Sequence, residues 1–120
     1  MKKKTLVLGA SLKSYRYSNY AIESLVMNNH EVVAIGSKKG KVMGINIETE
    51  FLPYKDIDTI TIYLNLKMQK PFYDYIVSLN PNRVIFNPGT ENPELYSILK
   101  ENNIPFEESC TLVLLASNQY

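Results

Sequence analysis

The stretch that decides the fold is Thr5-Leu-Val-Leu-Gly9-Ala-Ser-Leu-Lys-Ser-Tyr-Arg-Tyr-Ser18. Its first part, Thr5 to Gly9, is a short apolar run that ends in glycine, which is typical of a strand buried on both faces. A polar loop follows, and Ser18 has the side chain of a good N-cap for a helix that ends at Asn28. Glycine lets the backbone approach a ligand closely, and a helix N-terminus favours an anion. The stretch therefore predicts a strand, a phosphate-binding loop and a helix.

Strands and helices alternate along the rest of the chain. We expect strands over 31–36, 59–64 and 83–87, a short edge strand over 104–106, and helices over 68–79, from Pro93 onward and over 111–116. The segment 37–57 is irregular, although Gly44 to Ile47 could add a short strand. This order predicts an α/β, Rossmann-like, doubly wound and mainly parallel sheet with helices on both faces, formed by one domain over residues 1–120.

Composition and charge exclude several classes of protein. The chain has 120 residues, of which 45% are hydrophobic, and a single cysteine, so no intramolecular disulfide can form. Its 13 basic and 12 acidic residues give no field that would draw it to nucleic acid or a membrane surface. No apolar run approaches the ~20 residues of a membrane span, and the run after Lys4 is too short for a secretory signal. We expect a cytoplasmic protein.

The ends of the core strands carry the candidate binding residues. The carboxyl ends of parallel strands meet at one edge of a sheet, where ligands bind if the strand order reverses there. The loops after the four strands should therefore converge on one crevice. The predicted site residues are Gly9, Ala10, Ser11, Lys13, Tyr17, Ser18, Gly36, Ser37, Lys38, Leu64, Asn65, Asn87, Pro88 and Gly89.

The residues after the second strand indicate which nucleotide would fit. NAD-binding domains usually have an acidic residue at this point, which holds the ribose hydroxyls. Here Gly36-Ser37-Lys38-Lys39 is basic. Lysines attract a phosphorylated ribose, so the stretch favours NADP or coenzyme A over NAD.

Several motifs carry a resemblance to a known family. They are the Gly9-Ala10-Ser11 turn, Arg16-Tyr17-Ser18-Asn19, Lys38, Gly44, Asn87-Pro88-Gly89 and Cys110. In this order they resemble the small stand-alone CoA-binding domains, a family similar to the CoA-binding domain of succinyl-CoA synthetase. The resemblance implies a Rossmann-like domain that binds coenzyme A, often without a catalytic partner domain.

On that resemblance, the loop from Gly9 to Ser18 would hold the pyrophosphate, and Lys38 the phosphorylated ribose. Gly89 would let the backbone approach the pantetheine arm, while Tyr15 and Tyr17 are candidates to pack on the adenine or that arm. We expect a side chain at Gly9 to collide with the ligand or distort the turn, and to leave the fold largely intact. The alternative is that Gly9 only permits packing of the first helix.

The chain departs from the family at two places where members often have arginine: Leu64-Asn65 follows the third core strand, and Glu108-Ser109-Cys110 lies near the end. Two alternatives therefore stay open. One is an NADP-binding oxidoreductase-like domain, and the other is a protein-interaction module that kept the fold and lost its ligand. The sequence also leaves open a homodimer or an unknown protein partner.

Candidates for chemistry are few. His30 should lie at the edge of the sheet opposite the crevice, so Cys110 has no histidine to activate it, and we expect a structural, buried thiol. No metal-ligand spacing is present. We therefore interpret the chain as a nucleotide-binding module and not as an enzyme.

Overall fold

The computed structural model describes residues 2–120, and its strands form a single sheet. Over these residues the order is β3-β4-β2-β1-β5-β6-β7. All neighbours pair in parallel except β3 and β4. The bounds are β1 (Thr5–Ala10), β2 (Val32–Gly36), β3 (Gly40–Val42), β4 (Ile45–Glu48), β5 (Thr59–Ile62), β6 (Arg83–Phe86) and β7 (Phe106–Glu108).

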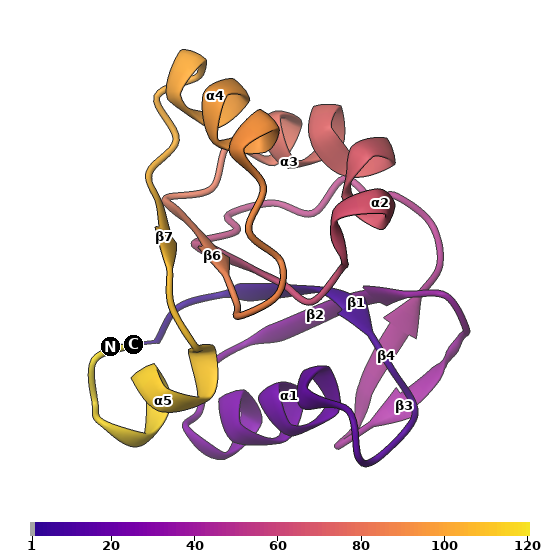
Figure 1. Cartoon of the computed structure of the whole chain (residues 1–120). Coiled ribbons are helices and arrows are strands. Elements are labelled where there is room, and N and C mark those ends of the chain that lie inside the picture. The colour runs from indigo at the N-terminus through magenta and orange to yellow at the C-terminus, as the bar shows by residue number, and fades with distance from the viewer. Residues whose placement is uncertain (1) are drawn as a thin grey trace.

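Helices cover both faces of this sheet. They are α1 (Tyr17–Met27), α2 (Leu66–Gln69), the 3-10 turn η1 (Lys70–Phe72), α3 (Tyr73–Leu79), α4 (Pro93–Glu101) and α5 (Thr111–Ala116). Figure 1 shows α1 and α5 on one face and α3 and α4 on the other. The predicted Rossmann-like fold is thus confirmed. Over residues 2–120, no helix has the length and apolar character that crossing a bilayer requires.

The central strand β1 supplies side chains to both cores. Leu6 and Leu8 are fully buried in the core beneath α3 and α4, whereas Val7 is fully buried in the core beneath α1 and α5. Successive side chains of a strand point to opposite faces, so a continuous apolar run is what a strand covered on both sides requires. Burial of one such side chain stabilises the fold by about 1.5–3 kcal/mol.

The start of α1 differs from the prediction that Ser18 caps it. The helix begins at Tyr17 and its N-cap is Arg16, whose side chain makes no capping hydrogen bond. A turn in which the Arg16 N–H donates to the Lys13 carbonyl (3.1 Å) starts the helix early. Ser18 consequently lies in the first turn and is 4% exposed.

The helix predicted over 68–79 is broken into pieces. Asn65 caps α2, since its Oδ1 accepts from the Met68 N–H at 3.0 Å, so the helix starts before Met68. Pro71 then falls inside η1, between α2 and α3, where its ring and missing N–H interrupt the hydrogen bonds of a continuous helix. The break turns Gln69 inward and leaves Met68 53% exposed.

The two edges of the sheet also differ in detail from the sequence prediction. The irregular segment contains a hairpin of β3 and β4, closed by Met43 and Gly44 with φ of 51° and 78°. Positive φ at both residues is what a two-residue hairpin turn needs. At the opposite edge, β7 starts at Phe106, after Pro105, because proline has no N–H for the ladder.

Candidate functional site

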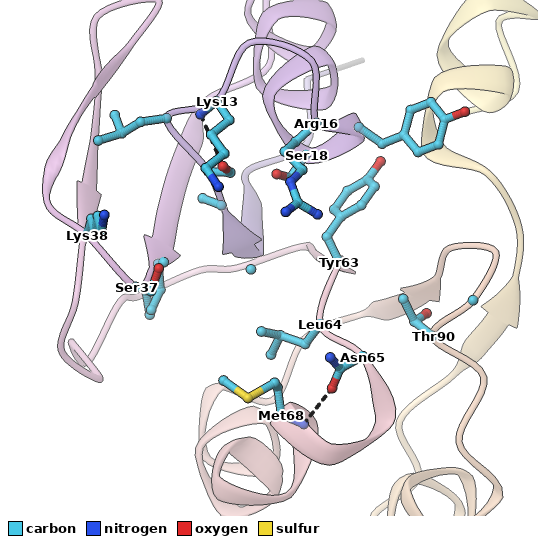
Figure 2. Close-up of a pocket in the computed structure, with 18 of the residues that line it drawn as sticks. Lys13, Arg16, Ser18, Ser37, Lys38, Tyr63, Leu64, Asn65, Met68 and Thr90 are labelled. Carbon is cyan, nitrogen blue, oxygen red and sulfur yellow. Dashed lines mark hydrogen bonds between the residues drawn. The ribbon is translucent and has the colours of Figure 1, made fainter.

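A crevice of about 720 Å³ opens at the carboxyl ends of β1, β2, β5 and β6 (Figure 2). The chain leaves β1 toward β2 on one side and later returns to β5 on the other side, so the strand order reverses between β1 and β5. This is the place where open α/β sheets bind ligands. The volume falls within the range of small-molecule sites, about 300–1,000 Å³.

Nearly all predicted site residues line this crevice. Those that do are Gly9, Ala10, Ser11, Lys13, Tyr17, Ser18, Gly36, Ser37, Lys38, Leu64, Asn65, Pro88 and Gly89. Gly9 and Gly89 therefore lie at the same edge of the sheet, as the predicted convergence of loops requires.

The crevice also has lining residues that the prediction did not include. They are Leu12, Arg16, Ile35, Tyr63, Met68, Phe72 and Thr90. Leu12 and Arg16 lie within the loop Gly9–Ser18 that was predicted to hold the pyrophosphate, although neither was among the predicted site residues. Met68 and Phe72 fall within the helix predicted over 68–79, and both line the crevice on either side of the break at Pro71.

One side of the crevice, which we call the basic wall, consists of the loop Gly9–Ser18 and residues 36–38. It carries Lys13, Arg16 and Lys38, and no aspartate or glutamate lines the crevice. Over residues 2–120 the ion pairs are Lys4–Glu31 and Arg83–Glu107, so none of the basic wall's cations is neutralised by a carboxylate. Unneutralised cations around a cavity favour an anionic ligand.

The loop of the basic wall is shaped by its own polar groups. The Lys13 N–H donates to Ser11 Oγ (3.1 Å), and Asn19 Nδ2 on α1 donates to the Ser11 carbonyl (2.9 Å). Tyr17 and Ser18 form the first turn of α1 at the crevice, where backbone N–H groups have no acceptor within the helix. This is the arrangement that binds phosphate in many proteins.

The structure gives Gly9 a role in the fold itself, whereas the sequence predicted a role in ligand binding. Its φ is +87°, and a Cβ built there would lie 2.8 Å from the Tyr63 carbonyl carbon and 2.9 Å from its oxygen. The collision would thus be with the backbone after β5. Gly9 also marks the point where the pairing of β1 with β2 shifts register. The expected distortion of the turn is thus supported, whereas the expectation that a side chain at Gly9 would leave the fold largely intact is wrong.

The other side of the crevice, which we call the neutral wall, follows β5 and β6. It consists of Tyr63, Leu64, Asn65, Met68, Phe72, Pro88, Gly89 and Thr90, none of them charged. Figure 2 shows Leu64 and Met68 across the crevice from Lys13 and Ser37. The two walls thus offer charge on one side and an uncharged, partly apolar surface on the other.

Asn87 does not line the crevice, and this corrects its assignment as a binding residue. It is 2% exposed. Its Nδ2 donates to Thr61 Oγ1 (2.7 Å) and the Ile62 carbonyl (2.9 Å), while its Oδ1 accepts from the Thr111 N–H (2.8 Å). These bonds fasten β5 and the start of α5 to the end of β6 beneath the site.

Tyr63 lies on the neutral wall with an enclosed hydroxyl. That hydroxyl is buried and has no hydrogen-bond partner within residues 2–120. Burial raises the pKa of the Tyr63 phenol far above its usual range, so the group stays protonated. A hydroxyl closed off from the cavity cannot exchange protons with a ligand there.

The histidine and the cysteine lie apart, as predicted. His30 is at the opposite edge of the sheet, where its Nδ1 accepts from the Lys3 N–H (2.9 Å) and its ring meets Tyr120 at 4.9 Å. Cys110 precedes α5, is half-buried and does not line the crevice. The expected full burial of the thiol is therefore only partly met. No group of three or more potential metal ligands occurs within residues 2–120.

Comparison with known proteins places the chain among others of the same fold. A family model described as a CoA binding domain matches residues 3–116. The crystal structure of an uncharacterized protein is 47% identical, with a TM-score of 0.97, and the match covers 100% of this chain and 99% of that one.

More distant similarities concern the fold alone. A Thermus thermophilus protein is 20% identical with a TM-score of 0.86, over 99% of this chain and 91% of that chain. An acetyl-coenzyme A synthetase from Ca. Korarchaeum cryptofilum is 14% identical with a TM-score of 0.73, over 88% of this chain and 25% of that one. None of the curated proteins compared with the chain is a match.

Proposed function

The chain belongs to the family of CoA-binding domains, and from this premise we propose that its crevice binds coenzyme A. The observation that carries the proposal is the charge of the lining: Lys13, Arg16 and Lys38 contribute cations, and no carboxylate lies among the lining residues. Coenzyme A has a pyrophosphate and a ribose phosphate, so a cavity with unneutralised cations on one wall suits it.

Each part of coenzyme A has a matching part of the crevice. The pyrophosphate would lie against the loop Gly9–Ser18, where backbone N–H groups at the start of α1 and the Lys13 and Arg16 side chains supply donors. The ribose phosphate would lie at Lys38, beyond the end of β2. The pantetheine arm, which is uncharged, would follow the neutral wall past Leu64 and Gly89.

We further propose that the protein binds its ligand without transforming it. No histidine, cysteine, aspartate or glutamate lines the crevice, and the phenol of Tyr63 is enclosed. General acid–base or nucleophilic catalysis needs such a group within hydrogen-bond distance of the reacting atoms. A carrier, sensor or regulatory role fits a site of this composition.

Calorimetry with coenzyme A, dephospho-CoA and NAD tests the proposal. We expect coenzyme A to bind most tightly, because only it places a phosphate on the ribose near Lys38. Equal affinity for all three would exclude a role of Lys38 in reading that phosphate, and absence of binding by all three would refute the proposed function. A native mass spectrum of the freshly purified protein adds a direct check, since a retained ligand is identified by its mass.

A further inference from the structure

Gln69 is a fully buried polar residue in a short helix whose other residues are exposed. Its exposed fraction is 0%, whereas Leu66 and Met68 of the same helix are 55% and 53% exposed. Glutamine is seldom buried unless its amide is fully hydrogen-bonded, since an unpaired buried amide is costly. The contacts of this amide therefore indicate why the chain keeps it there.

The Gln69 amide joins two loops that both line the crevice. Its Nε2 donates to the Leu64 carbonyl at 2.9 Å and to the Thr90 carbonyl at 2.8 Å. Leu64 follows β5 and Thr90 follows β6, and both belong to the neutral wall. In Figure 2, Leu64 and Thr90 lie on the separate loops that this side chain connects.

A second layer holds the amide in its orientation. Asn92 Nδ2 donates to Gln69 Oε1 at 2.9 Å and to the Tyr73 hydroxyl at 2.8 Å, and that hydroxyl donates to Glu94 Oε1 at 3.0 Å. Because Asn92 donates to the Gln69 oxygen, the nitrogen is fixed toward the two carbonyls. Networks in which each member is satisfied hold one geometry firmly.

The other buried amide beneath the site, that of Asn87, does not have this property. Asn87 connects strand ends and α5 below the crevice, so it fixes the sheet and not the opening. Gln69, by contrast, joins two segments of the neutral wall to each other.

From these contacts we propose that Gln69 is a positioning residue that sets the separation of the loops after β5 and β6, and thereby the affinity of the crevice for the uncharged arm of its ligand. The inference rests on the proposed function and adds that the two walls bind different parts of the ligand. The basic wall accounts for the phosphates, and the Gln69 network accounts for the pantetheine arm.

The test compares two probes on Gln69→Glu. Coenzyme A contains the pantetheine arm, and adenosine 3′,5′-bisphosphate lacks it. The new carboxylate cannot donate to either carbonyl, so both hydrogen bonds are lost. At pH 8 we therefore expect the dissociation constant of coenzyme A to rise about tenfold or more. The dissociation constant of adenosine 3′,5′-bisphosphate should change by less than about twofold, within ordinary additivity error.

The pH dependence of Gln69→Glu gives a readout that loss of packing would not. Burial raises the pKa of a carboxyl group, and its protonated form can again donate one hydrogen bond. Coenzyme A affinity of this variant, relative to wild type, should therefore recover in part between pH 8 and pH 5.5. Gln69→Met, which keeps the volume and has no donor, should show the same selective loss without recovery.

Controls separate positioning from stability. Ile104→Val removes one methyl group from a buried side chain at the other edge of the sheet, so it should lower stability and leave both affinities unchanged. Equal losses of both probes, unchanged coenzyme A affinity, or failure of both Gln69 variants to fold would each overturn the inference. Failure of the wild type to bind either probe is a different result, because it refutes the proposed function itself.

Discussion

The two walls of the crevice are built in opposite ways. The basic wall presents exposed side chains, and Lys13, Arg16 and Lys38 have no carboxylate partner among residues 2–120. The neutral wall is anchored by amides: Gln69 and Asn87 are 0% and 2% exposed, and each makes at least three hydrogen bonds. This difference shows that the basic wall supplies the charge of the crevice, whereas the neutral wall supplies a surface of fixed shape.

A physical reason favours this separation. Charged groups that a protein pairs internally are less available to a ligand, so cations intended for phosphates must stay unpaired and exposed. An uncharged ligand arm gives no strong attraction, and its binding depends on a cavity whose shape is fixed before the ligand arrives. The following variants test whether the two walls can be disturbed one at a time, beginning with the residue that joins them.

The largest effect is expected for Gly9→Ala, because Gly9 is where the walls meet. The added Cβ would lie 2.8 Å from the Tyr63 carbonyl carbon, and φ at +87° is strained for an L-residue. Steric conflict and strain together should lower the free energy of unfolding by about 3–5 kcal/mol. Urea denaturation followed by circular dichroism measures this, and a loss below that of Gly89→Ala would contradict the structural role.

The next effect is expected for Asn87→Ala, which disturbs the support of the neutral wall. It leaves the Thr111 N–H and the Ile62 carbonyl without the partner they have now, so we expect a loss of about 2–4 kcal/mol in the free energy of unfolding. Coenzyme A affinity of the folded variant should fall far less than in Lys38→Ala, because Asn87 does not line the crevice.

Asn82→Ala is the matched control for this variant. Asn82 is exposed and its side chain bonds only to Asp58, so its loss should cost less than about 1 kcal/mol. Similar losses in the two variants would mean that the buried hydrogen bonds of Asn87 stabilise the fold no more than an ordinary surface hydrogen bond does.

Lys38→Ala disturbs the basic wall alone. A charge-assisted contact to phosphate contributes about 1.5–3 kcal/mol, so calorimetry should show coenzyme A binding weakened about 10- to 100-fold. Dephospho-CoA affinity and the free energy of unfolding should both stay near wild type, since Lys38 is exposed and unpaired. Lys39→Ala, at a neighbouring exposed residue outside the crevice, should change neither affinity.

The sequence predicted the basic wall far better than the neutral one. The glycine loop and Lys38 are local patterns, and the alternation of strands and helices was enough to bring them together. Gln69 could not be recognised from the sequence, because its inward orientation depends on where the helix breaks. Its contacts with Leu64 and Thr90 follow from that orientation. Pro71 carried that information, but a proline is compatible both with the first turn of a helix and with a break between two.

Asn87 shows a second limit of prediction from sequence. Its place directly after a core strand favoured a binding role, and the same place puts its amide among strand-end backbone groups that need partners. Only the position of α5, which brings the Thr111 N–H to within 2.8 Å of its oxygen, decides between the two roles. Contacts across 24 residues of sequence are set by tertiary packing, which no local pattern encodes.

Gly89→Ala, the matched partner of Gly9→Ala, is expected to have the smaller effect of the two. Its φ is +91°, close to that of Gly9, but a Cβ there would have no atom within 4 Å. Only backbone strain remains, so the free energy of unfolding should fall by about 1–2 kcal/mol. The difference between the two variants then isolates the steric conflict at the meeting point of the walls.

Ligand binding adds a second comparison, because the new methyl group lies on the neutral wall, along the proposed course of the pantetheine arm. Coenzyme A should bind more weakly to Gly89→Ala, while adenosine 3′,5′-bisphosphate should bind as it does to wild type. Weakened binding of both ligands would place the phosphates on the neutral wall and reverse the assignment of the two walls.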